Sequence, residues 1–119
     1  MWNRNNQASL ERNQRRVDAG IISTHYPEVS SIVIRMMYKQ KGLAKPILRT
    51  LNLYPESCAF FKIDCLSNDC VDGGFDLTQV INSMIRNHRR EVKGELGCDD
   101  SGPRSDHATI AYAVAIQYI

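Results

Sequence analysis

Residues 76–90 combine helix-start signals with an apolar pattern of helical spacing, and they restrict the fold more than any other part of the chain. Asp76 is a residue type that favours the N-cap position, and Gln79 follows three residues later, as a capping box requires. Phe75, just before the cap, can pack on Val80 as a hydrophobic staple. The side chains expected on the buried face are Leu77, Val80, Ile81, Met84, Ile85 and His88. The sequence therefore predicts one long helix over residues 76–90.

Segments that alternate apolar and polar residues lie on both sides of this helix. Three of them precede it, over residues 29–39, 47–54 and 58–65, and two follow it, over residues 91–98 and 108–119. In the first segment the apolar face holds Ile32, Ile34, Met36 and Tyr38. In the fourth, Glu91, Lys93 and Glu95 form a face for water. Short turns join the first three segments, so we expect them to form an antiparallel meander.

The last segment, residues 108–119, carries no charged side chain. One of its faces holds Ile110, Tyr112, Val114, Ile116 and Tyr118, and the other holds Ala111, Ala113 and Ala115. A strand without charge is expected in the middle of a sheet, and small alanine side chains allow another layer to pack closely. Every pair of neighbouring strands is antiparallel if this last strand lies between the fourth strand and either the first or the third.

The element order predicts an α+β fold with a mainly antiparallel five-stranded sheet and the long helix packed on one face. The chain has 119 residues, of which 43% are hydrophobic and 24% charged, which is typical of one soluble globular domain. A weak helix is expected over residues 9–19, where Leu10 and Val17 share a thin apolar stripe, and it either packs at the domain edge or orders on a partner. We expect a flexible tail over residues 1–8 and a single domain over residues 9–119.

Four potential metal ligands fall where this topology brings strand ends together. They are Cys65, Cys70, Cys98 and His107. Cysteine and histidine are the ligands that tetrahedral zinc prefers, and zinc is the one candidate cofactor. The two pairs are separated by four and by eight intervening residues, the second being longer than the usual zinc-finger spacing.

Other interpretations of the cysteines stay open. Cys65 and Cys98 fall on inward faces, where cysteine often serves as a small buried hydrophobe. A disulfide or redox pair is the third interpretation, and a thiol-dependent enzyme or redox protein could use Cys65, Cys70 or Cys98. Cys70 lies shortly before a helix start, which favours a thiolate, but the neighbouring aspartates oppose it. His107 follows Asp106, yet neighbours in a strand point to opposite faces, and no third catalytic partner is evident.

The basic residues suggest a binding function in three places, although the net charge is only +2. They are Arg12, Arg15 and Arg16 near the N-terminus, Lys39, Lys41 and Lys45 around one turn, and Arg86, Arg89 and Arg90 at the helix end. Tyr38 and Tyr54 could stack on bases. The arginines at the helix end also fit the negative end of the helix dipole without any ligand.

The order of helix, meander and helix over roughly the first 90 residues resembles the double-stranded RNA-binding fold, which implies an RNA partner. Such domains use a lysine-rich start of the second helix for phosphate, where this chain has Gly73-Gly74-Phe75-Asp76. An acidic cap facing phosphates argues against that binding mode. Residues 65–77 also resemble small uncharacterised bacterial proteins, a similarity that implies no function.

Together these patterns predict a small cytoplasmic, non-enzymatic binding or accessory module. The partner is nucleic acid or protein, and a homo-oligomer is possible because sheet edges are exposed. No apolar run approaches the ~20 residues of a membrane span, so no membrane partner is expected. Four cysteines in a reducing compartment are expected as thiols or metal ligands before disulfides.

Overall fold

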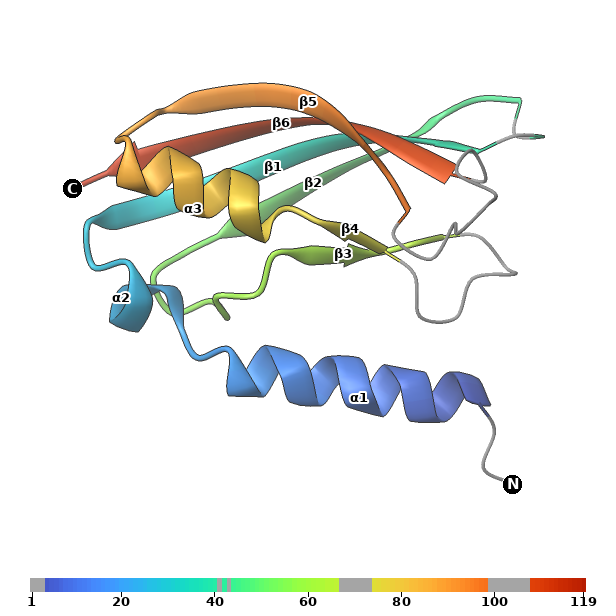
Figure 1. Cartoon of the computed structure of the whole chain (residues 1–119), viewed down its shortest axis with the longest axis horizontal. Coiled ribbons are helices and arrows are strands. Elements are labelled where there is room, and N and C mark those ends of the chain that lie inside the picture. Colours follow the sequence, from blue (N-terminus) through green and yellow to red (C-terminus); the bar gives the residue numbers. More distant parts are fainter. Residues whose placement is uncertain (1–3, 41, 43, 67–73, 99–107) are drawn as a thin grey trace.

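The main sheet of the protein has four antiparallel strands in the order β2-β1-β6-β5. The computed structural model describes residues 4–40, 42, 44–66, 74–98 and 108–119 (Figure 1). The strands are β1 (Val29–Gln40), β2 (Ile47–Leu53), β5 (Glu91–Gly97) and β6 (Ala108–Tyr118). The prediction of an α+β fold with a mainly antiparallel sheet is confirmed, but the prediction of five strands in that sheet is wrong.

The predicted third strand lies outside the main sheet. Strand β3 (Lys62–Asp64) pairs instead with β4 (Gly74–Asp76) in a separate two-stranded ribbon (Figure 1). A Cβ atom on Gly74 would lie 2.5 Å from the backbone oxygen of Ile63, so glycine permits the close approach of the two strands. Part of the predicted segment 58–65 does form a strand, Lys62–Asp64, but the alternation of apolar and polar residues could not identify the strand with which it pairs.

The helix after the ribbon is shorter than predicted. Helix α3 spans Thr78–Arg86, and Leu77 occupies its N-cap without a side-chain capping bond. Asp76 belongs to β4, and its Oδ1 accepts a hydrogen bond from the Thr78 backbone N–H at 2.9 Å. The prediction of a long helix over residues 76–90 is therefore wrong at both ends.

The turn after α3 explains its early end. His88 has a positive φ of 54°, a conformation that usually ends a helix and is rare for side chains other than glycine and asparagine. The backbone N–H groups of His88 and Arg89 donate to the carbonyls of Ile85 at 3.1 Å and Met84 at 2.7 Å. The His88 side chain is exposed and stacks on Tyr118, so it does not continue the buried face of the helix as predicted.

The core lies between the main sheet, α3 and the ribbon. Its sheet side is built from the even-numbered residues Ile32, Ile34, Met36, Tyr38, Ile110, Val114 and Ile116, all buried. Ile81, Met84 and Ile85 close it from α3, and Phe75 and Ile63 close it from the ribbon. The predicted inward faces of β1 and β6 and the wet face of β5 are confirmed. Strand β6 is central, between β5 and β1, one of the two predicted orders.

Two helices precede the sheet. Helix α1 spans Arg4–Asp18, starting five residues before the predicted position, and α2 spans Ile22–His25. The chain between them is tied to the body by a hydrogen bond from the Ala59 N–H to the Gly20 carbonyl at 2.8 Å. Helix α1 runs below the ribbon, on the side away from the main sheet (Figure 1), and its apolar residues Leu10 and Val17 are 53% and 71% exposed. No helix in the described part of the chain is long and apolar enough to cross a membrane.

The hydroxyl of Tyr118 links the end of β6 to the end of α3. It lies 3.1 Å from the carbonyl oxygen of Met84 and 2.7 Å from that of Arg89, to which it donates. Removal of a hydroxyl that satisfies two carbonyls costs about 1–2 kcal/mol. We expect Tyr118→Phe to lower the free energy of unfolding by that amount in urea titrations, whereas Tyr54→Phe, at an exposed tyrosine, should change it little.

The same variant should also change the alkaline limit of stability. Burial, and secondly the negative charge of Glu28, raise the pKa of Tyr118 above its ordinary value of 10.0. A raised pKa in the folded state contributes stability that is full below the unfolded-state pKa and is lost as the pH rises through the folded-state pKa. The midpoint temperature of the wild type should therefore fall more steeply above pH ~10 than that of Tyr118→Phe. If the midpoint temperatures of the wild type and of Tyr118→Phe fell equally steeply above pH ~10, the fold would not raise the pKa of Tyr118.

Candidate functional site

The face of the main sheet opposite α3 carries the odd-numbered residues of β1, β5 and β6. Two hollows of about 390 Å³ each lie on it, and every described residue that lines them belongs to one of the four strands of the sheet. The core-forming side chains all point to the other face. This surface, called the open face below, is thus the part of the sheet that no described helix or ribbon strand covers.

The strand register gives the open face a floor and two walls. Ala111, Ala113 and Ala115 form the floor along β6. Facing them on β1 are Met37, Arg35 and Val33, and facing them on β5 are Glu95, Lys93 and Glu91. Alanine side chains are short, so the middle strand lies lower than its neighbours. A shallow groove with an apolar floor therefore runs along β6.

Two cations face each other across the centre of this groove. Ala113 lies opposite Arg35 on one side and opposite Lys93 on the other. Two strand spacings separate the backbones of the cationic residues by roughly 10 Å. Both side chains are exposed, and neither forms an ion pair with another described residue. The two cations therefore offer contacts to an anionic group above Ala113, with Glu91 and Glu95 on either side of Lys93.

Apolar side chains continue the groove towards β2. Leu48 lies opposite Met37, and Thr50 lies opposite Arg35. These residues line the second hollow together with the alanine floor. Leu48 is 71% exposed, which is unusual for a large apolar side chain in a strand. The open face thus has two cations on either side of Ala113, an apolar part towards β2, and Glu91 and Glu95 beside Lys93 on its β5 wall.

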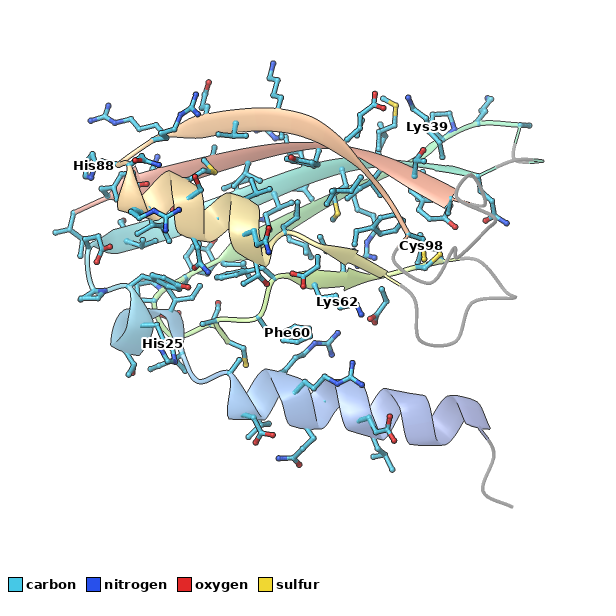
Figure 2. All side chains as sticks on the ribbon, in the orientation of Figure 1. His25, Lys39, Phe60, Lys62, His88 and Cys98 are labelled. Atoms are coloured by element: carbon cyan, nitrogen blue, oxygen red, sulfur yellow. The ribbon has the colours of Figure 1, made fainter. Side chains whose placement is uncertain are left out.

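The structure does not gather the predicted basic residues into one surface. Lys39 and Lys45 lie at the β1–β2 turn, whereas Arg86, Arg89 and Arg90 lie at the end of α3. Figure 2 shows Lys39 at one end of the sheet and His88 at the other. The ten residue steps along β1 from Val29 to Lys39 separate these ends by about 33 Å.

The arginines near the N-terminus form a third, separate group on α1. Arg15 pairs with Glu11 at 3.9 Å, and Arg16 pairs with Asp64 at 3.6 Å and lies over the Phe60 ring. These contacts give Arg16 a structural role in attaching α1. The side chain of Arg12 and all of Lys41 fall outside the described residues. The described members of the predicted set therefore form no continuous basic surface.

The structure brings two of the four predicted metal ligands towards the same end of the molecule. Cys65 Sγ lies 3.7 Å from the Tyr38 hydroxyl, which donates to Gln40 Oε1 at 2.9 Å. Cys98 is buried at that end of the sheet (Figure 2), and its backbone N–H donates to the carbonyl of Ala108, the residue opposite Gln40. Both thiols fit the inward positions that the sequence predicted.

The other two predicted ligands, Cys70 and His107, lie outside the described residues. Among the residues that are described, no group of three or more His, Cys, Asp or Glu side chains is placed to hold a metal ion. The zinc site therefore stays a prediction, as does the use of these thiols in catalysis.

Sequence reasoning missed Arg35 and Lys93 as a pair. Lys93 lies on the face of β5 that is predicted to meet water, and Arg35 lies on the face of β1 opposite the predicted apolar face, but 57 residues lie between them in the chain. Only the order β1-β6-β5 places them on either side of one alanine. The signal that could have found them was the row of alanines at positions 111, 113 and 115. Short side chains on one strand leave the longer side chains of both neighbouring strands projecting above it.

The chain was compared with protein-family models, curated proteins and solved structures, and none of them matches it. No function can therefore be transferred from a relative.

Proposed function

We propose that the chain is a small cytoplasmic, non-enzymatic binding module that docks a protein partner on the open face of its sheet. The observation that carries the proposal is the groove itself, with its alanine floor, the exposed Leu48, and the cations Arg35 and Lys93, which form no ion pair with any other described residue. An exposed apolar surface beside charged groups is typical of protein interfaces.

The chemistry of the groove favours a partner segment with an acidic side chain between apolar ones. A carboxylate above Ala113 would reach the Arg35 guanidinium, which can bind it with two parallel hydrogen bonds. Apolar side chains on either side would cover the alanine floor and Leu48. A protein partner fits better than nucleic acid because the described cations outside this groove are dispersed over the two ends of the sheet, the ribbon and α1.

Site-specific photo-cross-linking in cells tests the proposal. A benzoylphenylalanine placed at Thr50, on the wall of the groove, should give a discrete adduct with another protein. The same residue at Glu56, which is exposed in the turn after β2, serves as the control and should give none. Adducts that nuclease removes, or equal adducts at both positions, would contradict a protein-docking groove.

A further inference from the structure

Strand β5 is one of the two outer strands of the sheet, so the peptide groups on its outer side have no strand partner among the described residues. Two backbone bonds fix which residues these are. The Cys98 N–H donates to the Ala108 carbonyl at 3.1 Å, and the Ile116 N–H donates to the Arg90 carbonyl at 2.8 Å. Even-numbered residues of the β5 segment therefore bond to β6. The odd-numbered residues, Glu91, Lys93, Glu95 and Gly97, direct their N–H and C=O groups outwards.

Charged side chains on an outer strand usually prevent pairing with other strands. The charges of β5 have a special order, however, because Glu91, Lys93 and Glu95 alternate in sign on one face. If a second copy of the strand pairs in antiparallel orientation with full overlap of Glu91–Gly97, Gly94 lies on the two-fold axis. Lys93 then lies opposite Glu95 of the second copy, and Glu95 lies opposite its Lys93. Full overlap and opposite charge are therefore obtained in the same register.

The alternation of inward and outward backbone hydrogen-bonding groups along β5 agrees with this register. Lys93 and Glu95 are both outward-bonding residues, so each cross-strand pair can exchange two N–H···O=C bonds. The inner faces agree as well, because half-buried Val92 lies opposite half-buried Leu96 of the second copy. Those pairs occupy the non-hydrogen-bonded positions, where Cα atoms approach to about 4.5 Å and side chains touch. Each half of the interface thus gains one ion pair and one apolar pair.

The structure also explains why a glycine, Gly94, lies at the centre of β5. The Tyr112 ring covers Gly94, and a Cβ on this glycine would lie 2.5 Å from the Tyr112 hydroxyl oxygen. The aromatic ring therefore extends the core to the outer edge of the sheet above Gly94. In the paired arrangement the two rings lie beside each other over the axis and protect the new backbone bonds from water.

Neighbouring registers are disfavoured by charge. A centre at Lys93 places that lysine opposite itself and Glu91 opposite Glu95, and a centre at Glu95 places two glutamates together. Like charges directly opposite each other are destabilising. A centre at Val92 pairs Glu91 with Lys93 but aligns only the first residues of the strand, because β5 begins at Glu91 directly after the turn from α3.

We propose that two copies of the chain pair through β5, antiparallel and centred on Gly94, to form one continuous sheet. The dimer places the two open faces side by side on the same surface. Lys93 belongs to both the groove and the seam, whereas Arg35 lies two strands away from the seam and keeps its exposed cation, so the part of the groove formed by β6, β1 and β2 stays uncovered in the dimer. The dimer and the docking groove share Lys93 of β5, but their tests are distinguishable, because the dimer is measured by sedimentation and the groove by cross-linking at Thr50 of β2.

Charge exchange tests the pairing and its register by sedimentation equilibrium. The wild type should be a dimer, and Lys93→Glu and Glu95→Lys should each weaken dimerisation by about tenfold or more, since either change creates two like-charge pairs. The double variant K93E/E95K should restore the dimer. An equal mixture of the two single variants should form heterodimers, because their charges again become opposite. Lys39→Glu makes the same charge change away from β5 and is the matched control.

Circular dichroism of each variant shows whether the monomer keeps its fold, which is expected because both side chains are exposed. A monomeric wild type would overturn the proposal. It would also be overturned if the single variants dimerised as well as Lys39→Glu, or if the double variant and the mixture stayed monomeric while folded.

Discussion

Replacement of Phe75 by alanine is expected to lower the free energy of unfolding by about 3–5 kcal/mol. Phe75 is 1% exposed and is among the largest fully buried side chains. Its ring meets Tyr38 edge to face, with centroids 6.1 Å apart, and so joins the ribbon to the main sheet. Alanine would leave a cavity there, because β4 is held to β3 by backbone pairing and cannot collapse into the space.

Urea unfolding at constant pH measures this loss. Leu48→Ala, which removes an apolar side chain that is 71% exposed, is the control and should change stability by less than about 0.5 kcal/mol. If Phe75→Ala cost no more than Leu48→Ala, the ribbon would not be part of the core. The difference between the two variants, measured with the same probe, is therefore the informative quantity.

The alternating segments were predictable because each one contains its own signal. Burial of Ile32, Ile34 and Met36 on β1, and the central place of β6, follow from side-chain period and the absence of charge. These properties depend on local sequence alone. They gave the α+β fold, the antiparallel pairing and both faces of the central strand.

The ribbon was not predictable in the same way. Residues 58–65 alternate like a sheet strand, but only Lys62–Asp64 forms one, and the end of its partner strand, Gly74–Asp76, carries the signals that predict a helix start. The capping residues misled for a physical reason. Asp76 does accept a bond from the Thr78 N–H, as an N-cap residue could, yet it does so from the end of a strand. The same short-range bond serves two backbone conformations.

In the candidate site, too, the face on which each residue lies could be predicted from the sequence, but which residues meet across strands could not. The polar strand faces that hold Arg35 and Lys93 were readable from period two. Their position across Ala113 depends on strand order, which pairs β6 with both β1 and β5. The predicted basic set failed to form one surface for the opposite reason: clusters along the chain, such as Arg86, Arg89 and Arg90, need not meet other clusters in space.

The groove would be closed most directly by Ala113→Glu. The new carboxylate would lie between Arg35 and Lys93, so the free protein should keep its fold and lose none of its stability. A partner that brings its own carboxylate to this point would meet a like charge and a raised floor. Such a conflict in a desolvated interface costs about 3 kcal/mol, so binding should weaken by about a hundredfold.

Gln79→Glu creates the same side chain at an exposed position of α3, on the other side of the sheet, and is the matched control. Thermal unfolding of both variants should match the wild type, which separates an effect on docking from an effect on folding. Stability that fell in Ala113→Glu alone would mean that the floor of the groove is not accessible in the free protein.

The most direct measurement of the docking groove is the dissociation constant of the protein cross-linked at Thr50, determined by calorimetry with wild type, Ala113→Glu and Gln79→Glu. The groove predicts equal affinity for wild type and Gln79→Glu and a loss of about a hundredfold for Ala113→Glu. Equal affinity for all three, with each variant folded, would contradict docking on the open face.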